Sequence, residues 1–176
     1  MAGLQWSEAL WLDLPLMDDT HREFVDLLAQ VQRSDDAQLP EAWDTLITHT
    51  EAHFGQEDAW MQATRFASSN CHSMQHSVVL QVMREGLQAA RGGQADALAA
   101  LRQMAHELGV WFSSHAQSMD AALALHLRRV GYDPHTGVVS APGALPTEPI
   151  HGCGGSCGSE AHASDTAIAA AEAATA

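Results

Sequence analysis

The strongest constraint in this sequence is a set of seven potential metal ligands that recur at helical spacings. They are His21, His53, Glu57, His72, His76, His115 and Asp120. Residues four positions apart lie on one face of an α-helix, about 6 Å apart along its axis. His53 and Glu57, like His72 and His76, would therefore present two donor atoms from one helical face. The pattern favours a helical protein with a shared interior site.

The apolar residues predict four helices. Their periodicity places them over residues 18–33, 40–63, 71–91 and 94–129. One of the residues 18–20 would cap the first helix, and Gly131 would end the last. No stretch shows the two-residue alternation of a strand. With short connections, these segments predict an all-α fold, an antiparallel up-down-up-down four-helix bundle.

Two segments flank the predicted bundle. Residues 1–17 are apolar without a clean helical period, so we expect an N-terminal arm whose aromatic side chains cover a seam between helices. From residue 134 the chain is rich in Gly, Pro, Ser, Thr and Ala, a composition typical of a disordered tail. We therefore predict one domain over residues 1–133, including the arm, and a flexible C-terminal tail over 134–176.

The position of each ligand along its helix brings the set together. His21 begins the first predicted helix and His72 begins the third, whereas Glu57 and His115 lie late in the second and fourth. In an antiparallel bundle these four regions share one end. Asp120 follows His115 by five residues, which in an α-helix rotates it by roughly 140°. That offset is poor for two ligands of one ion.

The donor types favour iron. Imidazole suits iron, zinc and copper, whereas bridging carboxylates suit a dinuclear site. Seven ligands exceed the four of a tetrahedral zinc site. Each pair alone is weak evidence, because His-x-x-x-His on a helix is more often a surface or core feature than a metal site. All the pairs in order, at matching helix ends, favour a metal centre.

Charge limits the class of partner. The formal net charge is −14, and all eight basic residues are arginine. Nucleic acid and anionic membranes both require a positive surface, so neither is expected as a partner. No window has the length and apolarity of a membrane span, and the N-terminus lacks the pattern of a secretory signal. We expect a soluble cytoplasmic protein.

The three cysteines do not form a disulfide framework. Cys71 lies beside His72, where it could be an additional soft ligand, although a small buried thiol is the more common role of such a residue. Cys153 and Cys157 lie in the glycine-rich run HGCGGSCG. They could form a redox pair or a metal-delivery site, or belong to an appendage without chemistry.

Four segments closely resemble the hemerythrin family. They are MDDTHREFVDLL (17–28), HFGQEDAWM (53–61), HSMQH (72–76) and WFSSHAQSMD (111–120), within a resemblance that covers about residues 5–130. The resemblance implies a non-haem centre of two iron ions with a bridging oxo or hydroxo group. His72, His76 and His115 would hold one ion and His21 and His53 the other, with Glu57 and Asp120 bridging both. The second ion would keep an open position for dioxygen.

An apolar pocket should enclose such a centre, to exclude water and retard irreversible oxidation. Trp111, one turn before His115, and Met61, one turn after Glu57, are the strongest candidates for its wall. Further candidates are Phe24, Phe54 and Met119. Most of these side chains would equally suit the core of any helical bundle. The connection ATRFASSN (63–70) departs from the aromatic residue and proline that the family usually has there.

The resemblance implies reversible dioxygen binding, for transport, storage or scavenging, rather than an enzyme. One alternative is a di-iron enzyme, such as a peroxidase, an oxidase or a nitric-oxide-handling protein, on the same site. Another is an oxygen or redox sensor module. The expected partner is dioxygen. The sequence favours no particular oligomeric state and is compatible with a monomer.

Overall fold

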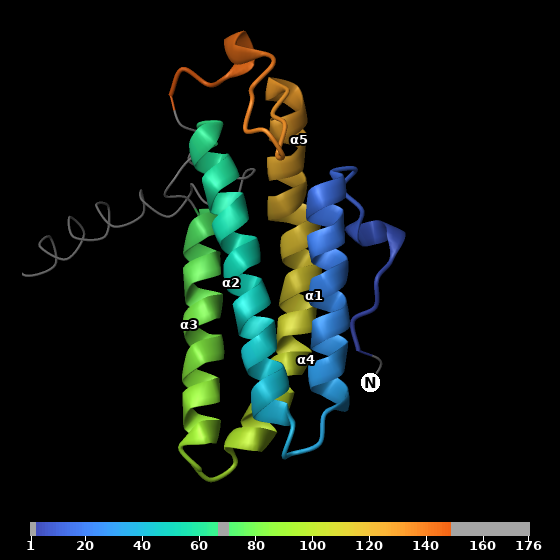
Figure 1. Cartoon of the computed structure of the whole chain (residues 1–176), viewed down its shortest axis with the longest axis vertical. Coiled ribbons are helices and arrows are strands. Elements are labelled where there is room, and N and C mark those ends of the chain that lie inside the picture. The colour runs from blue at the N-terminus through green and yellow to red at the C-terminus, as the bar shows by residue number, and fades with distance from the viewer. Residues whose placement is uncertain (1–2, 67–70, 149–176) are drawn as a thin grey trace, which may run out of the picture.

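The computed structural model describes residues 3–66 and 71–148 of the chain. Its main helices are α1 (Pro15–Arg33), α2 (Leu39–Ala63), α3 (Cys71–Arg91), α4 (Ala97–His115) and α5 (Ala121–Val130). α4 and α5 form one column, interrupted by the π-helical turn Ala116–Asp120 (Figure 1). α1 packs against α2 and α4, and α3 packs against the same two neighbours. The all-α four-helix bundle predicted from the sequence is confirmed.

The first helix begins earlier than predicted. Pro15 occupies the first helical position, where its fixed φ is favourable and its missing N–H is not needed. The N-cap is Leu14, so the predicted cap within residues 18–20 was wrong. Asp18 instead lies inside the first turn, where its buried carboxylate accepts hydrogen bonds from the amides of Leu12 (2.8 Å) and Leu14 (3.1 Å). These bonds hold the arm against the start of the helix.

The N-terminal arm lies alongside α1 (Figure 1). It contains one short 3₁₀ helix, Glu8–Leu10. Trp6 packs against the hydrophobic core, and its ring lies 4.8 Å from the guanidinium carbon of Arg22. Trp11 is 57% exposed, so it does not cover a seam of the bundle as predicted.

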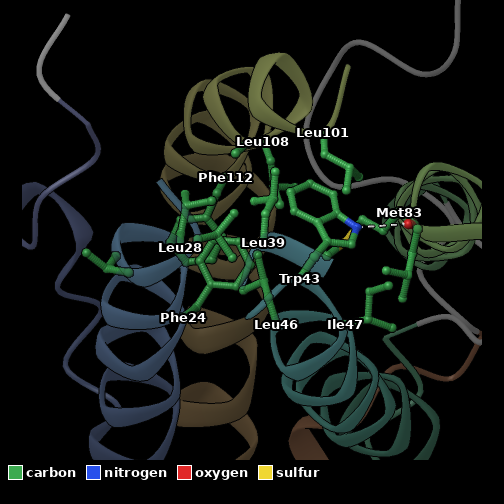
Figure 2. Close-up of a cluster of buried hydrophobic side chains, with 14 of the residues drawn as sticks. Phe24, Leu28, Leu39, Trp43, Leu46, Ile47, Met83, Leu101, Leu108 and Phe112 are labelled. Atoms are coloured by element: carbon green, nitrogen blue, oxygen red, sulfur yellow. Dashed lines mark hydrogen bonds between the residues drawn. The ribbon is translucent and has the colours of Figure 1, made fainter. Parts of the chain in front are cut away.

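The apolar interior consists of two clusters that lie toward opposite ends of the bundle. The larger one is centred on Trp43, whose indole nitrogen donates a hydrogen bond of 2.9 Å to the carbonyl oxygen of Met83 (Figure 2). The smaller one lies near the start of α1 and the end of α2, and it includes Met17, Trp60 and Leu127. Along α1, α2 and the α4–α5 column, the polar residues of the proposed metal site lie between these clusters in sequence.

The chain after α5 differs from the predicted tail. Gly131, in the left-handed region at φ 61°, ends the helix as predicted. The amide of Ser140 then donates to the carbonyl oxygen of Gly131, and Tyr132 forms an isolated bridge with Val139. Backbone hydrogen bonds hold this turn, and the short 3₁₀ helix Pro142–Ala144 that follows it packs against α5, so residues 134–144 fold back toward that helix. Residues 149–176, with both tail cysteines, lie outside the described residues.

The described part of the chain has no strand beyond the isolated bridge near residue 132, in agreement with the sequence pattern. Within the same residues, none of the helices combines the length and apolarity needed to cross a membrane.

Candidate metal centre

The bundle brings all seven predicted ligands to one end. His21 lies near the start of α1 and His72 near the start of α3, whereas Glu57 and His115 lie near the ends of α2 and α4. The antiparallel arrangement places these four regions at the same height. The seven residues are between 0% and 3% exposed. They form a buried polar layer between the two hydrophobic clusters.

A π-helical turn aligns the last two ligands. His115 ends α4, and the turn Ala116–Asp120 places Asp120 five residues later. A π turn closes hydrogen bonds between residues five apart, so it brings such residues onto one face. His115 Nε2 lies 3.0 Å from Asp120 Oδ1. The predicted rotation of about 140°, which assumed an uninterrupted α-helix, was therefore wrong.

One group of donor atoms comes from three histidines and both carboxylates. His72, His76, His115, Glu57 and Asp120 each offer one atom, all within 4.8 Å of one another. His76 Nε2 faces His115 Nε2 at 3.2 Å. Two ring nitrogens at this distance, both aimed at the same space, are the arrangement expected of imidazoles that share a metal ion.

A second group comes from two histidines and the same glutamate. Donor atoms of His21, His53 and Glu57 also lie within 4.8 Å of one another. His53 Nε2 is 2.9 Å from Glu57 Oε1, and His21 Nε2 is 3.3 Å from Asp120 Oδ2. Asp120 therefore contacts this group as well, through its other oxygen.

Each carboxylate divides its two oxygens between the groups. Glu57 directs Oε1 toward His53, and Oε2 toward His72 at 3.2 Å. Asp120 directs Oδ2 toward His21, and Oδ1 toward His72 at 3.0 Å. Two carboxylates that each face both groups are placed to bridge two metal ions.

Hydrogen bonding alone does not satisfy these buried atoms. Among the described residues, His21 Nε2, Glu57 Oε2 and both oxygens of Asp120 have no hydrogen-bond partner. Buried polar groups without partners destabilise a fold by about 1–3 kcal/mol each, so such a cluster is rare without a ligand. The donor set of imidazoles and carboxylates fits a pair of first-row transition-metal ions.

Without metal, the carboxylates must be balanced by protons on the histidines. Burial by itself would lower the pKa of His21, but the nearby carboxylates of Asp120 and Glu57 raise it to about 9. Burial would raise the pKa of Glu57, but electrostatic interaction with His53 and contacts with His21 hold this pKa well below its usual value. The two carboxylates therefore favour positive charge in the centre, whether it is carried by protons or by metal ions.

The seven clustered residues lie in a stretch that matches a known protein family. The sequence profile of the Hemerythrin HHE cation binding domain matches residues 12–125, which include all seven. The chain belongs to the hemerythrin family. It is also similar to a protein named bacteriohemerythrin from Ralstonia nicotianae, with 38% identity over 133 residues, or 76% of this chain and 95% of that protein. No solved structure matches the chain.

Two aromatic rings of this hemerythrin-family chain cover the three-histidine group. Trp111 stacks on His115 with 4.5 Å between ring centroids. Phe54 stacks on His76 at 3.9 Å and also lies 5.4 Å from the ring of His53. Both residues contact ligand rings of the centre, and their predicted role as a pocket wall stays a prediction.

A different pair of rings covers the two-histidine group. Phe112 is fully buried, and its ring centroid lies 5.1 Å from that of His21. Phe24, another predicted wall residue, stacks on Phe112 at 4.1 Å. Sequence analysis did not single out Phe112, because it follows Trp111 directly and the helical rotation that separates their roles cannot be assigned from spacing alone.

The remaining predicted wall residues lie close to the centre along the chain. Met61 is fully buried in the smaller hydrophobic cluster, and Met119 is partly buried in the π turn. Their place in a pocket wall stays a prediction. Cys71, the first residue of α3, is partly buried and is in neither donor group.

Two further residues contact the Nδ1 atoms of predicted ligands, on the side of each ring that faces away from the other ligands. His76 Nδ1 lies 3.2 Å from Asp58 Oδ1, and His115 Nδ1 lies 3.3 Å from Gln75 Oε1. Each directly adjoins a ligand in sequence, Glu57 and His76 respectively. Adjacency was the only sequence signal for them, and it does not distinguish a supporting residue from a solvent-facing one.

Proposed function

We propose that this chain binds dioxygen reversibly at two iron ions held by the seven clustered residues. The observation that carries the proposal is the unequal division of donors between two groups that share both carboxylates. Three imidazoles and two carboxylate oxygens serve one ion, whereas two imidazoles and two carboxylate oxygens serve the other. With a solvent-derived bridge, the first ion would be six-coordinate and the second would keep one open position.

A pair of ferrous ions supplies the two electrons that reversible dioxygen binding requires. The task of the chain is to hold the ions and to exclude water. The centre lies between two apolar clusters, and its ligands are nearly fully buried. Such an environment limits solvent access and therefore slows irreversible oxidation. The similarity to a protein named bacteriohemerythrin supports the same function.

The proposal predicts an absorption change that depends on dioxygen. Protein loaded anaerobically with two equivalents of Fe²⁺ should be colourless, gain near-ultraviolet and visible bands in air, and lose them under argon over repeated cycles. Zn²⁺-loaded protein, which has no redox chemistry, should show none of these changes. A missing band, or a band that argon does not remove, would contradict reversible binding. Steady consumption of peroxide or nitric oxide would instead indicate an enzyme.

The ring of Phe112 should protect the open position. Phe112→Ala leaves space beside His21, where water can approach the ion. We expect irreversible oxidation in air to become about tenfold faster or more, whereas iron content stays the same. The measurement is the loss of the reversible absorption per oxygenation cycle. Phe66→Ala is the matched control, because Phe66 is also buried but packs in the smaller cluster, next to His126. Equal rates in both variants would exclude a specific role for Phe112.

A further inference from the structure

A histidine that binds metal through Nε2 carries its proton on Nδ1, and this N–H group needs an acceptor. Acceptors of this kind fix the tautomer and the orientation of the ring, and a carboxylate acceptor also makes the other nitrogen a stronger donor. The two donor groups of the centre differ in how well they meet this need.

Asp58 serves His76 of the three-histidine group. Its Oδ1 lies 3.2 Å from His76 Nδ1, so the carboxylate can accept the ring N–H. Asp58 follows the ligand Glu57 in α2, and its side chain is 45% exposed. The carboxylate is thus partly hydrated, while the imidazole that it orients is buried.

Gln75 serves His115 of the same group. Its Oε1 lies 3.2 Å from the indole nitrogen of Trp111 and 3.3 Å from His115 Nδ1. An indole N–H can only donate, so the amide atom that faces it is the oxygen. The same oxygen then requires a proton on His115 Nδ1, which leaves the lone pair on Nε2. Gln75 therefore selects the tautomer of His115 that can bind metal.

The two-histidine group lacks this support. Within the described residues, the Nδ1 atoms of His21 and His53 have no hydrogen-bond partner. Apart from the contacts of their Nε2 atoms with Asp120 and Glu57, both rings are held by packing, including the edge contact of His21 with Phe112. Their orientation and donor strength are correspondingly less fixed than those of His76 and His115.

From this asymmetry we infer that Asp58 and Gln75 are positioning residues, which make the three-histidine position retain its metal ion longer than the two-histidine position. The inference rests on the proposed two-metal site. The two positions would then differ in how long they keep a metal ion partly because of Asp58 and Gln75, which contact the Nδ1 atoms of the ligands, and not only because of the number of ligands at each position.

The test uses the full chain loaded with Co²⁺, whose d–d absorption reports bound metal without dioxygen chemistry. A chelator should remove the metal in two phases, and His53→Ala should remove the fast phase. Asp58→Asn should accelerate only the slow phase, by about tenfold or more. Asp44→Asn is the matched control, because Asp44 also lies on α2 with a similarly exposed carboxylate, 43%, in an ion pair with Arg91. This control should leave both phases unchanged.

Gln75 provides a second test with a conservative variant. Gln75→Leu removes the acceptor and should accelerate the slow phase, whereas Gln75→Glu keeps an acceptor and should retain it. Binding of fewer than two Co²⁺ ions per chain would contradict the two-metal site itself. Binding of two ions that leave in one phase, or a slow phase unaffected by both Asp58→Asn and Gln75→Leu, would overturn only the present inference.

Discussion

Replacing Glu57 by glutamine is expected to lower the metal content of the chain from two ions to one or none. Glu57 belongs to both donor groups, and its two oxygens face different groups. A glutamine side chain has the same shape but offers one neutral oxygen acceptor in place of two anionic ones. The bridge between the positions is therefore lost. We also expect no reversible absorption in air, because one ferrous ion cannot supply both electrons.

Metal content per chain, measured by elemental analysis after gel filtration, tests this prediction. Glu51→Gln is the matched control, because Glu51 lies on the same helix but is exposed and pairs with Arg84. It should keep two ions and the reversible absorption. Far-ultraviolet circular dichroism should show the same helix content for both variants. Two ions bound to folded Glu57→Gln protein would contradict a bridging role for this carboxylate.

The part of the site that depends on local spacing was predictable. His53 and Glu57 lie one α-helical turn apart, as do His72 and His76, so any amphipathic helix that buries one member buries the other. The antiparallel order of the helices then follows from the short connections. For these reasons the sequence predicted both the bundle and the cluster of seven ligands.

The relation between His115 and Asp120 was not predictable from spacing. A separation of five residues places two side chains on different faces of an α-helix and on the same face of a π turn. Nothing in the residues 116–119 distinguishes these alternatives by helix propensity. In the folded bundle, the π turn places both side chains in the same polar layer. This placement depends on tertiary packing and not on the local sequence.

The supporting residues were missed for a related reason. Asp58, Gln75 and Phe112 each neighbour a predicted ligand or wall residue, and their roles depend on how two helices are rotated against each other. The start of α1 was missed because Pro15 follows an apolar arm, whereas the acids at 18–19 resemble caps. Sequence periodicity defines which face is buried, but not which neighbouring helix that face contacts.

Removing the metal is expected to lower the midpoint of thermal unfolding by roughly 10 °C near neutral pH. A ligand at 1,000 times its dissociation constant stabilises a fold by about 4 kcal/mol, which corresponds to about 2–4 °C per kcal/mol for a chain of this size. The metal-free bundle should remain folded, because the protonated ring of His21 balances part of the charge of Asp120 and Glu57. The pKa of His21 is raised to about 9 by these carboxylates, against the opposing effect of burial.

The same pKa sets the direction of the pH dependence. A raised pKa in the folded state stabilises the metal-free protein fully below the unfolded value of 6.5, and this stabilisation is lost as the pH rises through about 9. Metal binding has the opposite dependence, because it displaces the proton. The difference in midpoint between loaded and metal-free protein should therefore grow from pH 7 to pH 9, as followed by circular dichroism. Glu57→Gln protein should show a smaller difference throughout. Coincident unfolding curves with and without metal would mean that these residues do not hold metal in the folded state.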